Sequence, residues 1–424
     1  MTTASRPAPP PIGGAMAPFR NTVFRDIWIA NMLSSIGSVM QAVAAAWMMT
    51  ELTSSHMLVA LIQASSVIPF LVLGVFAGVI ADAYDRRLVM LWAQVFMLAV
   101  SAVLSVMGYA QAITPYSLIL LTLLVGLGNA LNAPAWQASV RLQVDRADLP
   151  QAIALNSIAF NIARSLGPAL GGIVISLWSV NMAFALNAIS YVAMIVVLMR
   201  WHPAEQDRMR APIGSAIMVG LRFCFGSSPI VRILLRGLVF GLGAAGFQGL
   251  LPVIVRQQFH GNQIGYGLVV GAFGAGSVLC ALWVGAVRRR IGSENLIGLS
   301  TVLFAGSHML LSVAHGLPIA LVAAMIAGVG WIAVLTSLNV AMQLRSPDAI
   351  LARCMSIYQA VVFGGMAIGA WAWGALADQV GLVATLRLSA LWLAVSLLLR
   401  LVAPMPARDE GRIEPPVVIR EEPV

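Results

Sequence analysis

PFLVLGVFAGVIADAYDRRLVMLWAQVFMLAV, residues 69–100, holds two apolar runs separated by a short charged segment at residues 82–87. Each run belongs to a stretch of about 20 mostly apolar residues, the length that an α-helix needs to cross a membrane. The runs do not alternate between apolar and polar residues, as the strands of a membrane barrel would. The stretch therefore predicts two membrane-spanning helices joined by a charged turn.

The same pattern recurs along the chain, which is 60% apolar and 10% charged over 424 residues. That composition provides too little polar surface for a water-soluble fold. We predict an all-α polytopic membrane protein with twelve transmembrane helices in two pseudo-symmetric six-helix bundles. The expected spans are residues 24–49, 58–81, 88–109, 116–137, 149–178, 182–199, 230–255, 264–287, 296–314, 318–343, 353–377 and 382–402.

Composition also divides the chain into segments. Residues 1–18 are Pro-rich and polar, without the apolar core of a cleaved signal peptide, and residues 404–424 mix Pro with charged residues, so we expect a disordered tail at each end. Between them we expect an N-terminal bundle at 19–200, a cytoplasmic central loop at 201–228 and a C-terminal bundle at 229–403. QVDRADLPQA from Gln143 resembles QLRSPDAILA from Gln343, as parallel repeats would. Asp148 and Asp348 could each cap the helix that follows.

The arginines predict the orientation. All but four of the 25 basic residues fall on one side of the predicted spans, the exceptions being Arg164, Arg236, Arg256 and Arg387. Positive charge accumulates in cytoplasmic loops, so both termini are expected in the cytoplasm, with the protein in the inner (plasma) membrane. This topology accounts for the net charge of +9 without a nucleic-acid partner. Cys224, Cys280 and Cys354 lack metal-ligand spacing, and we expect free thiols, no metal and no cofactor.

The segment GVIADAYDRRLVM, which starts at Gly78, carries the first functional signature. It resembles the signature of the major facilitator superfamily between the second and third spans. The resemblance implies a conformational latch, formed by Gly78, Asp82, Arg86 and Arg87, that holds the inner side shut in the outward-open state. The alternative is an ordinary positively charged loop. The corresponding GAVRRRIG in the second half has Arg289 where an acid is expected.

The fifth span contains NIARSLGPALGG, from Asn161. It is similar to the signature of family members that exchange substrate for protons, G-x8-G-x3-G-P-x2-G-G. Proline loosens a helix and glycines allow close helix contact, although a generic kink would have the same residues. The matching positions are Ala154, Ala163, Gly167, Pro168, Gly171 and Gly172.

Three further stretches, FRDIWIANMLSSIG, ELTSS and NAPAWQA, together with NIARSLGPALGG, resemble the subgroup that contains enterobactin exporters and macrolide efflux proteins. The resemblance covers the first six spans and is looser beyond them. An arginine that many family members carry in the fourth span is replaced by Thr122, so its proton relay does not transfer to this chain.

Polar residues within the spans are candidates for substrate binding, although each could equally hold helices together. Arg164, near the middle of the fifth span, must face protein or water, because a charge there costs at least about 2.5 kcal/mol against lipid. It either attracts anionic substrate groups or is satisfied by neighbouring carbonyls. The candidates are Asn31, Ser34, Ser38, Gln41, Gln63, Asn156, Arg164, Gln248, Asn339, Tyr358 and Gln359.

Carboxylates lie only near the ends of the spans, at Asp26, Glu51 and Asp378. Glu51 is the candidate for proton coupling. The chain has no reactive constellation of an enzyme and no attached signalling domain of a sensor. We therefore expect a monomeric, proton-coupled antiporter for efflux of an amphipathic siderophore-like or drug-like small molecule by alternating access. The alternatives are an importer of a small organic solute and a membrane-embedded sensor.

Overall fold

The computed structural model describes residues 16–203, 213–347 and 350–405, apart from the side chains at 74–75, 78–79, 81–83, 213–217 and 352. Within this part the chain is helical and has no strand. The long helices are α1 (Thr22–Leu52), α2 (His56–Ala83), α3 (Arg86–Tyr109), α4 (Pro115–Ser139), α5 (Leu149–Leu177), α6 (Val180–Arg200), α7 (Ile213–Gly226), α8 (Ser228–Val253), α9 (Gln263–Val313), α10 (Leu317–Arg345), α11 (Leu351–Val380) and α12 (Leu382–Ser396). The short ones are η1 (Ala17–Arg20), η2 (Val140–Leu142), the π-helix η3 (Ile254–Gln258) and α13 (Leu399–Val402).

Eleven of the described helical segments are long and apolar enough to cross a membrane, and one of them, α9, contains two spans. As a straight rod its 51 residues would extend about 75 Å, more than twice the hydrocarbon core. Gly292 interrupts it with φ 82° and ψ 163°, a conformation that glycine adopts at little cost. The residues on either side therefore form two arms of a hairpin, and the prediction of twelve spans is confirmed.

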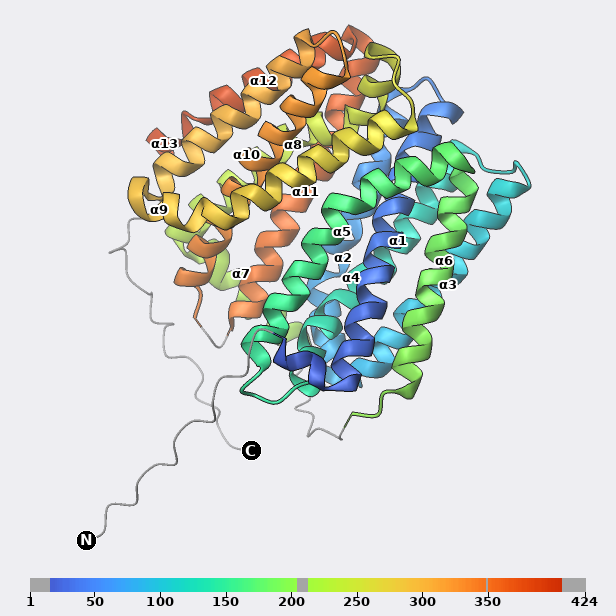
Figure 1. Ribbon diagram of the computed structural model, residues 1–424. Helices are drawn as coiled ribbons and strands as arrows, with labels where there is room; N and C mark the ends of the chain where they lie inside the picture. The colour runs from blue at the N-terminus through green and yellow to red at the C-terminus, as the bar shows by residue number, and fades with distance from the viewer. Residues whose placement is uncertain (1–15, 204–212, 348–349, 406–424) are drawn as a thin grey trace.

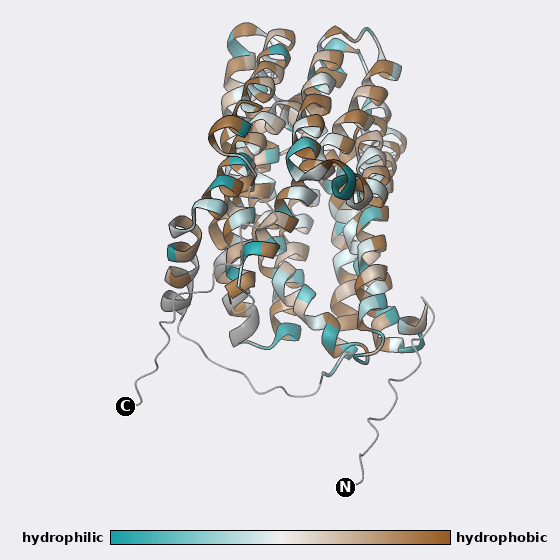
Figure 2. Ribbon diagram, turned by 90° about the vertical axis from the view of Figure 1, so that its left-hand side faces the viewer, coloured by the Kyte–Doolittle hydropathy of each residue, from teal (hydrophilic) through white to brown (hydrophobic). Residues whose placement is uncertain are grey.

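The helices group into two bundles, α1–α6 and α8–α13 (Figure 1). We call the side where α1 begins the inner side and the opposite side the outer side. Hydrophobic residues cover most of the length of the helices, and hydrophilic residues gather toward their inner ends (Figure 2). The arrangement packs each helix against its neighbours and leaves an apolar surface around the bundles that faces lipid.

The cores of the two bundles differ. In the C-terminal bundle Phe240, Phe247, Phe273, Phe304 and Trp331 form a cluster with ring centroids 5.4–6.5 Å apart. The N-terminal bundle instead has a buried hydrogen-bond network, described below. Aromatic packing and buried hydrogen bonds are both ways to join helices in a membrane, where apolar burial alone does not favour association.

Several segments differ from the prediction. The expected central loop contains α7, where Gly220 packs against Arg353 and Ile357 of α11. The Cys224 thiol is hydrogen-bonded with that of Cys354, and this bond together with burial raises the pKa of Cys224. With 14 residues α7 is too short to cross a membrane, so the prediction of spans did not include it.

The tails and the predicted caps lie partly outside the described residues. Residues 1–15, 204–212 and 406–424 are not described. Ala17 and Pro18, at the end of the predicted N-terminal tail, are buried at the start of η1, and the next residue, Phe19, packs against Trp28 at 5.1 Å between ring centroids. Asp148 stands at the N-cap of α5 but makes no capping bond, because its backbone is already helical rather than extended. Asp348 lies outside the described residues. The three cysteines are free, as expected.

Candidate functional site

The two bundles meet mainly along two helix pairs, α2 with α11 and α5 with α9. In the second pair the backbones touch. A Cβ atom placed on Gly172 would lie 2.6 Å from the carbonyl oxygen of Gln263, and one on Gly267 would lie 2.5 Å from that of Pro168. No side chain fits in these contacts. We call this interface, residues 164–172 against 263–274, the α5–α9 seam.

The seam ends near the middle of the membrane. A Cβ on Gly274 would meet the carbonyl oxygen of Arg164 at 2.6 Å, which is the innermost of these contacts. Farther toward the inner side, Ile158 and Ala154 continue the same face of α5 at helical spacing, and both are exposed. Ala281 of α9 is exposed as well. Figure 1 shows α5 and α9 together at their outer ends and diverging toward the inner side. Helices α5 and α9 are therefore in contact at the outer side and apart at the inner side.

Hydrogen bonds close the outer end of the other pair. Asp378, in the last turn of α11, accepts hydrogen bonds from Ser55 Oγ at 2.9 Å, from the His56 backbone N–H at 2.6 Å and from that of Met57 at 3.2 Å. The His56 Nδ1 atom also lies 3.2 Å from Asp378 Oδ1. A carboxylate at the start of α2 satisfies unpaired backbone donors and interacts favourably with the positive end of the helix dipole. Asp378 thus joins the two bundles at the outer side.

The π-helix η3 adds two more bonds across the outer end. Arg256 donates to Thr50 Oγ1 at 3.0 Å, and Gln257 Oε1 lies 3.2 Å from His56 Nε2. A π-turn changes the register of the helix and so redirects these side chains. The carboxylate of Asp378 could be recognised in the sequence, whereas the roles of His56 and η3 could not, because no local pattern shows that the ends of α1, α2 and α8 meet.

Arg164 lies at the point where the bundles separate. Its guanidinium carbon is 5.5 Å from the centre of the Phe160 ring, in a cation–π contact. Among the described residues it makes no hydrogen bond or ion pair through its side chain. The neighbouring Ser165 Oγ is also buried and has no hydrogen-bond partner among the described residues. A half-buried cation with unused donors can therefore attract an anionic or electron-rich group at this point.

The antiporter-like motif packs in two directions. Gly167 and Gly171 face Val39 and Met40 of α1, within the N-terminal bundle, and Ala163 is buried. Pro168 and Gly172 face α9, across the seam, whereas Ala154 is exposed farther inward. The motif therefore fixes α5 to its own bundle on one face and allows close contact with the other bundle on the adjacent face.

The polar stripe of α1 faces mainly into its own bundle. Gln41 Oε1 accepts from Ser101 Oγ at 2.9 Å and from Asn187 Nδ2 at 2.7 Å. The hydroxyls of Ser38 and Tyr191 are 3.2 Å apart, and Asn187 Nδ2 also donates to Tyr191. The structure thus uses Ser38 and Gln41 to join α1 to α3 and α6. On the same stripe, Ser34 is buried and Asn31 half-buried.

The remaining substrate-binding candidates are in different environments. Tyr358 is buried and donates to the Leu335 carbonyl at 3.4 Å, and Asn339 accepts from Gln343 at 2.6 Å. Asn156 Oδ1 and Gln248 Nε2 are buried without a hydrogen-bond partner among the described residues. Gln63 is half-buried and Gln359 exposed. Asn156 and Gln248 thus keep polar atoms available for a ligand, whereas Tyr358 and Asn339 already have partners.

The predicted latch is only partly visible. Arg87 donates to the carbonyls of Leu198 and Met199, both at 2.8 Å, and so caps the end of α6 in its own bundle. Arg86 donates to the Ala138 carbonyl at 3.4 Å. The side chains of Gly78 and Asp82 lie outside the described part. The latch therefore stays a prediction.

Glu51 is exposed at the outer end of α1. Its carboxylate accepts from the Trp47 indole N–H at 2.8 Å, and the Trp47 ring lies 6.0 Å from that of Tyr266 on α9. The proton-coupling candidate is therefore linked through one side chain to the opposite bundle.

Residues 13–424 match the sequence family of transmembrane secretion effectors (MFS_3). The chain belongs to this family. It is 27% identical over 395 residues to an enterobactin exporter (EntS) of Citrobacter koseri, covering 89% of this chain and 91% of that protein. It is 25% identical over 284 residues to a staphyloferrin A transporter of Staphylococcus aureus, covering 65% of this chain and 70% of that protein.

The fold agrees with that assignment. A crystal structure of a mutant nucleoside transporter, NupG, superimposes with a TM-score of 0.76 at 14% identity, covering 90% of this chain and 99% of that one. The chain is thus a multi-pass inner-membrane protein of the major facilitator type, and its family is one of efflux transporters of small molecules.

Proposed function

We propose that the protein exports an amphipathic small molecule bearing an anionic or electron-rich group in exchange for protons, by alternating access. The observation that carries the proposal is Arg164, whose guanidinium has no polar partner among the described residues at the point where the bundles separate. The relatives named for enterobactin export and staphyloferrin A transport favour siderophore-like substrates. Drug-like anions are the second class, and import is the alternative direction.

Proton coupling would act through Glu51. When its carboxylate is ionised, the bond from Trp47 at 2.8 Å is charge-assisted, and protonation would weaken it. Trp47 lies against Tyr266 of the other bundle, so this change would loosen the outer contact between the bundles.

Transport in proteoliposomes with an imposed pH gradient tests the proposal. We expect flux of an anionic siderophore-like substrate to follow the gradient, and Glu51→Gln to remove that dependence. Arg164→Gln should weaken anionic substrates about tenfold through loss of a charge-assisted contact, while neutral substrates change little. Arg387→Gln removes the same charge from an exposed position of α12, away from the seam, and is the matched control.

Two outcomes would reject parts of this function. Flux that is independent of the gradient would reject proton exchange. Equal losses for anionic and neutral substrates would make Arg164 a structural residue.

We further propose that the transporter works as a monomer with both termini in the cytoplasm, as the arginine distribution predicts. A single cysteine at Ser54, in a background with the three native cysteines replaced by serine, should react with an impermeant reagent added outside the cell. Labelling only from the cytoplasm would reverse the orientation.

A further inference from the structure

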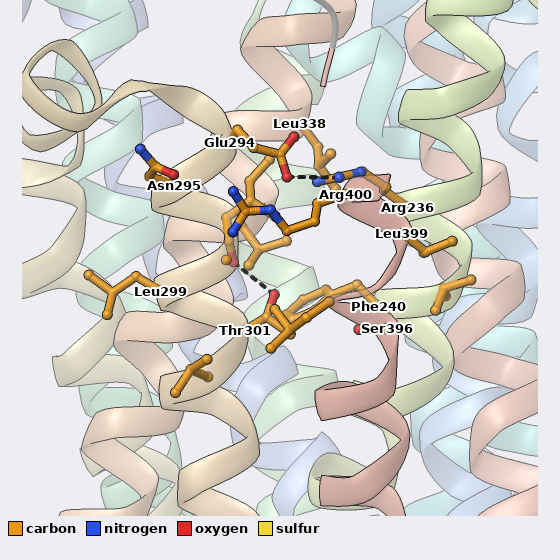
Figure 3. A pocket seen from close by; sticks show the side chains of 16 residues that line it. Arg236, Phe240, Glu294, Asn295, Leu299, Thr301, Leu338, Ser396, Leu399 and Arg400 are labelled. Atoms are coloured by element: carbon orange, nitrogen blue, oxygen red, sulfur yellow. Dashed lines mark hydrogen bonds and ion pairs between the residues drawn. The ribbon is translucent and has the colours of Figure 1, made fainter. Parts of the chain in front are cut away.

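A cavity of about 200 Å³ lies in the C-terminal bundle, away from the α5–α9 seam (Figure 3). Its walls come from α8, α10, the second arm of α9 and the end of the chain around α12 and α13. Sites for drug-sized ligands usually measure about 300–1,000 Å³, so this cavity suits a smaller group. Glu294 stands just after the Gly292 turn and Arg400 in α13, close to the end of the described chain, which places the cavity at the inner side of the membrane.

The cavity has one more positive than negative charge. Arg236 is 7% exposed and pairs with Glu294, with 2.8 Å between Nη2 and Oε1, and it also donates to the Ala403 carbonyl at 2.7 Å. The second carboxylate oxygen of Glu294 accepts from the Met405 backbone N–H at 2.7 Å. Both oxygens of the acid are therefore occupied, and the ion pair is neutral.

Arg400 supplies the extra charge. Figure 3 shows its side chain among the cavity residues, beside the Arg236–Glu294 pair. In the described part of the chain its guanidinium makes no hydrogen bond or ion pair. Five N–H donors and one uncompensated positive charge at the cavity fit the oxygens of a phosphate, which guanidinium binds in bidentate geometry.

Apolar side chains surround these charges. Val239 and Leu397 line the cavity, and the lining residues Leu299 and Val302 are each 51% exposed. Beyond Arg400, Val402 is 82% exposed. In a membrane such a surface contacts acyl chains rather than water, so the headgroup of a lipid can reach the cavity from this side.

We propose that this cavity binds the phosphate of an anionic phospholipid from the inner leaflet, with Arg400 as its ligand and the neutral Arg236–Glu294 pair as a fixed wall. Basic pockets between helices on the cytoplasmic side are suited to anionic headgroups, and the lipid's chains lie along Leu299 and Val302. The side of the membrane follows the orientation proposed above. Lipid binding itself does not depend on which solute the transporter carries.

Purified protein titrated with phosphatidylglycerol in detergent, followed by native mass spectrometry and thermal unfolding, tests the site. We expect saturable binding of one lipid and a rise in Tm, both absent with phosphatidylcholine. Arg400→Gln should weaken binding about tenfold, since it removes a charge-assisted bond. Gly298→Leu should weaken it at least as much: Gly298 lines the cavity, and a Cβ there meets nothing within 4 Å, so the added side chain can fill the space.

Two variants provide matched controls. Arg387→Gln removes an exposed arginine of α12, and Gly306→Leu adds the same side chain to the same arm of α9, again where a Cβ meets nothing within 4 Å. Both should bind lipid like the wild type. Equal binding by Arg400→Gln and Arg387→Gln, equal binding of phosphatidylcholine, or equal stabilisation by inorganic phosphate alone would each overturn the proposal.

Discussion

The outer and inner ends of the interface between the bundles are built differently. At the outer end α5 and α9 touch through glycines, and Asp378 bonds to the start of α2. Toward the inner side the same face of α5 is exposed at Ala154 and Ile158. Contact between backbones leaves no side chain that can adapt, so the outer end is either closed or open, which suits rocking of two rigid bundles between two states.

The largest effect should follow from a substitution that prevents the outer end of the interface from closing. A leucine at Gly267 would meet the backbone of Pro168, so Gly267→Leu should destabilise the closed outer end by about 1–3 kcal/mol. We expect transport to fall at least about tenfold and a cysteine at the outer end of the seam to become reactive from outside. Gly306→Leu, in open space on the same helix, is the control. Normal transport by Gly267→Leu would show that the seam need not close this tightly.

A smaller effect is expected from removing the negative charge of Asp378 at the same outer end. Asp378→Asn keeps an acceptor for Ser55 and the α2 backbone but loses the charge, which should cost about 1.5 kcal/mol and shift the equilibrium about tenfold toward the outward-open state. Asp26→Asn is the control, because Asp26 pairs only with the adjacent Arg25 in the described structure and lies at the inner end of α1. Accessibility of an outer thiol measures the shift. The same shift in both variants would contradict a specific role for Asp378.

The inner end should respond in the opposite direction. If Asp82 belongs to the latch, Asp82→Asn should favour the state that is open inward and lower turnover severalfold, with little change in abundance. Turnover per molecule of purified protein, compared with its yield in the membrane, separates these effects. Wild-type turnover would remove Asp82 from the latch.

The smallest effect should distinguish neighbouring glycines of the motif. A Cβ on Gly171 approaches Met40 Cα at 3.2 Å within the N-terminal bundle, whereas one on Gly172 approaches the Gln263 oxygen at 2.6 Å across the seam. Gly171→Ala should therefore change the conformational equilibrium less than about twofold, and Gly172→Ala more. Equal shifts in thiol accessibility would mean that the two faces of α5 are not independent.

Which parts of the site could be predicted depended on the range of the interactions. The motif at Gly167 and Pro168 and the intramembrane charge of Arg164 are local features, visible in a single helix. The stripe at Ser38 and Gln41 was equally visible, but its direction was not, because a polar face can turn to a transport path or to another helix. Asn187, which donates to Gln41, lies 146 residues away from it in the chain, so only the packing of α1 on α6 shows the network.

By itself the sequence determined that this protein lies in a membrane, where its twelve spans are and which family it resembles, because apolar length, charge and short motifs act within one helix or one turn. Only the tertiary structure decided which helix faces meet: the glycine contacts of the α5–α9 seam, the bond from Asp378 to α2 and the pairing of Arg236 with Glu294. These contacts join residues far apart in the chain, and their geometry depends on how whole helices pack, which no local pattern specifies.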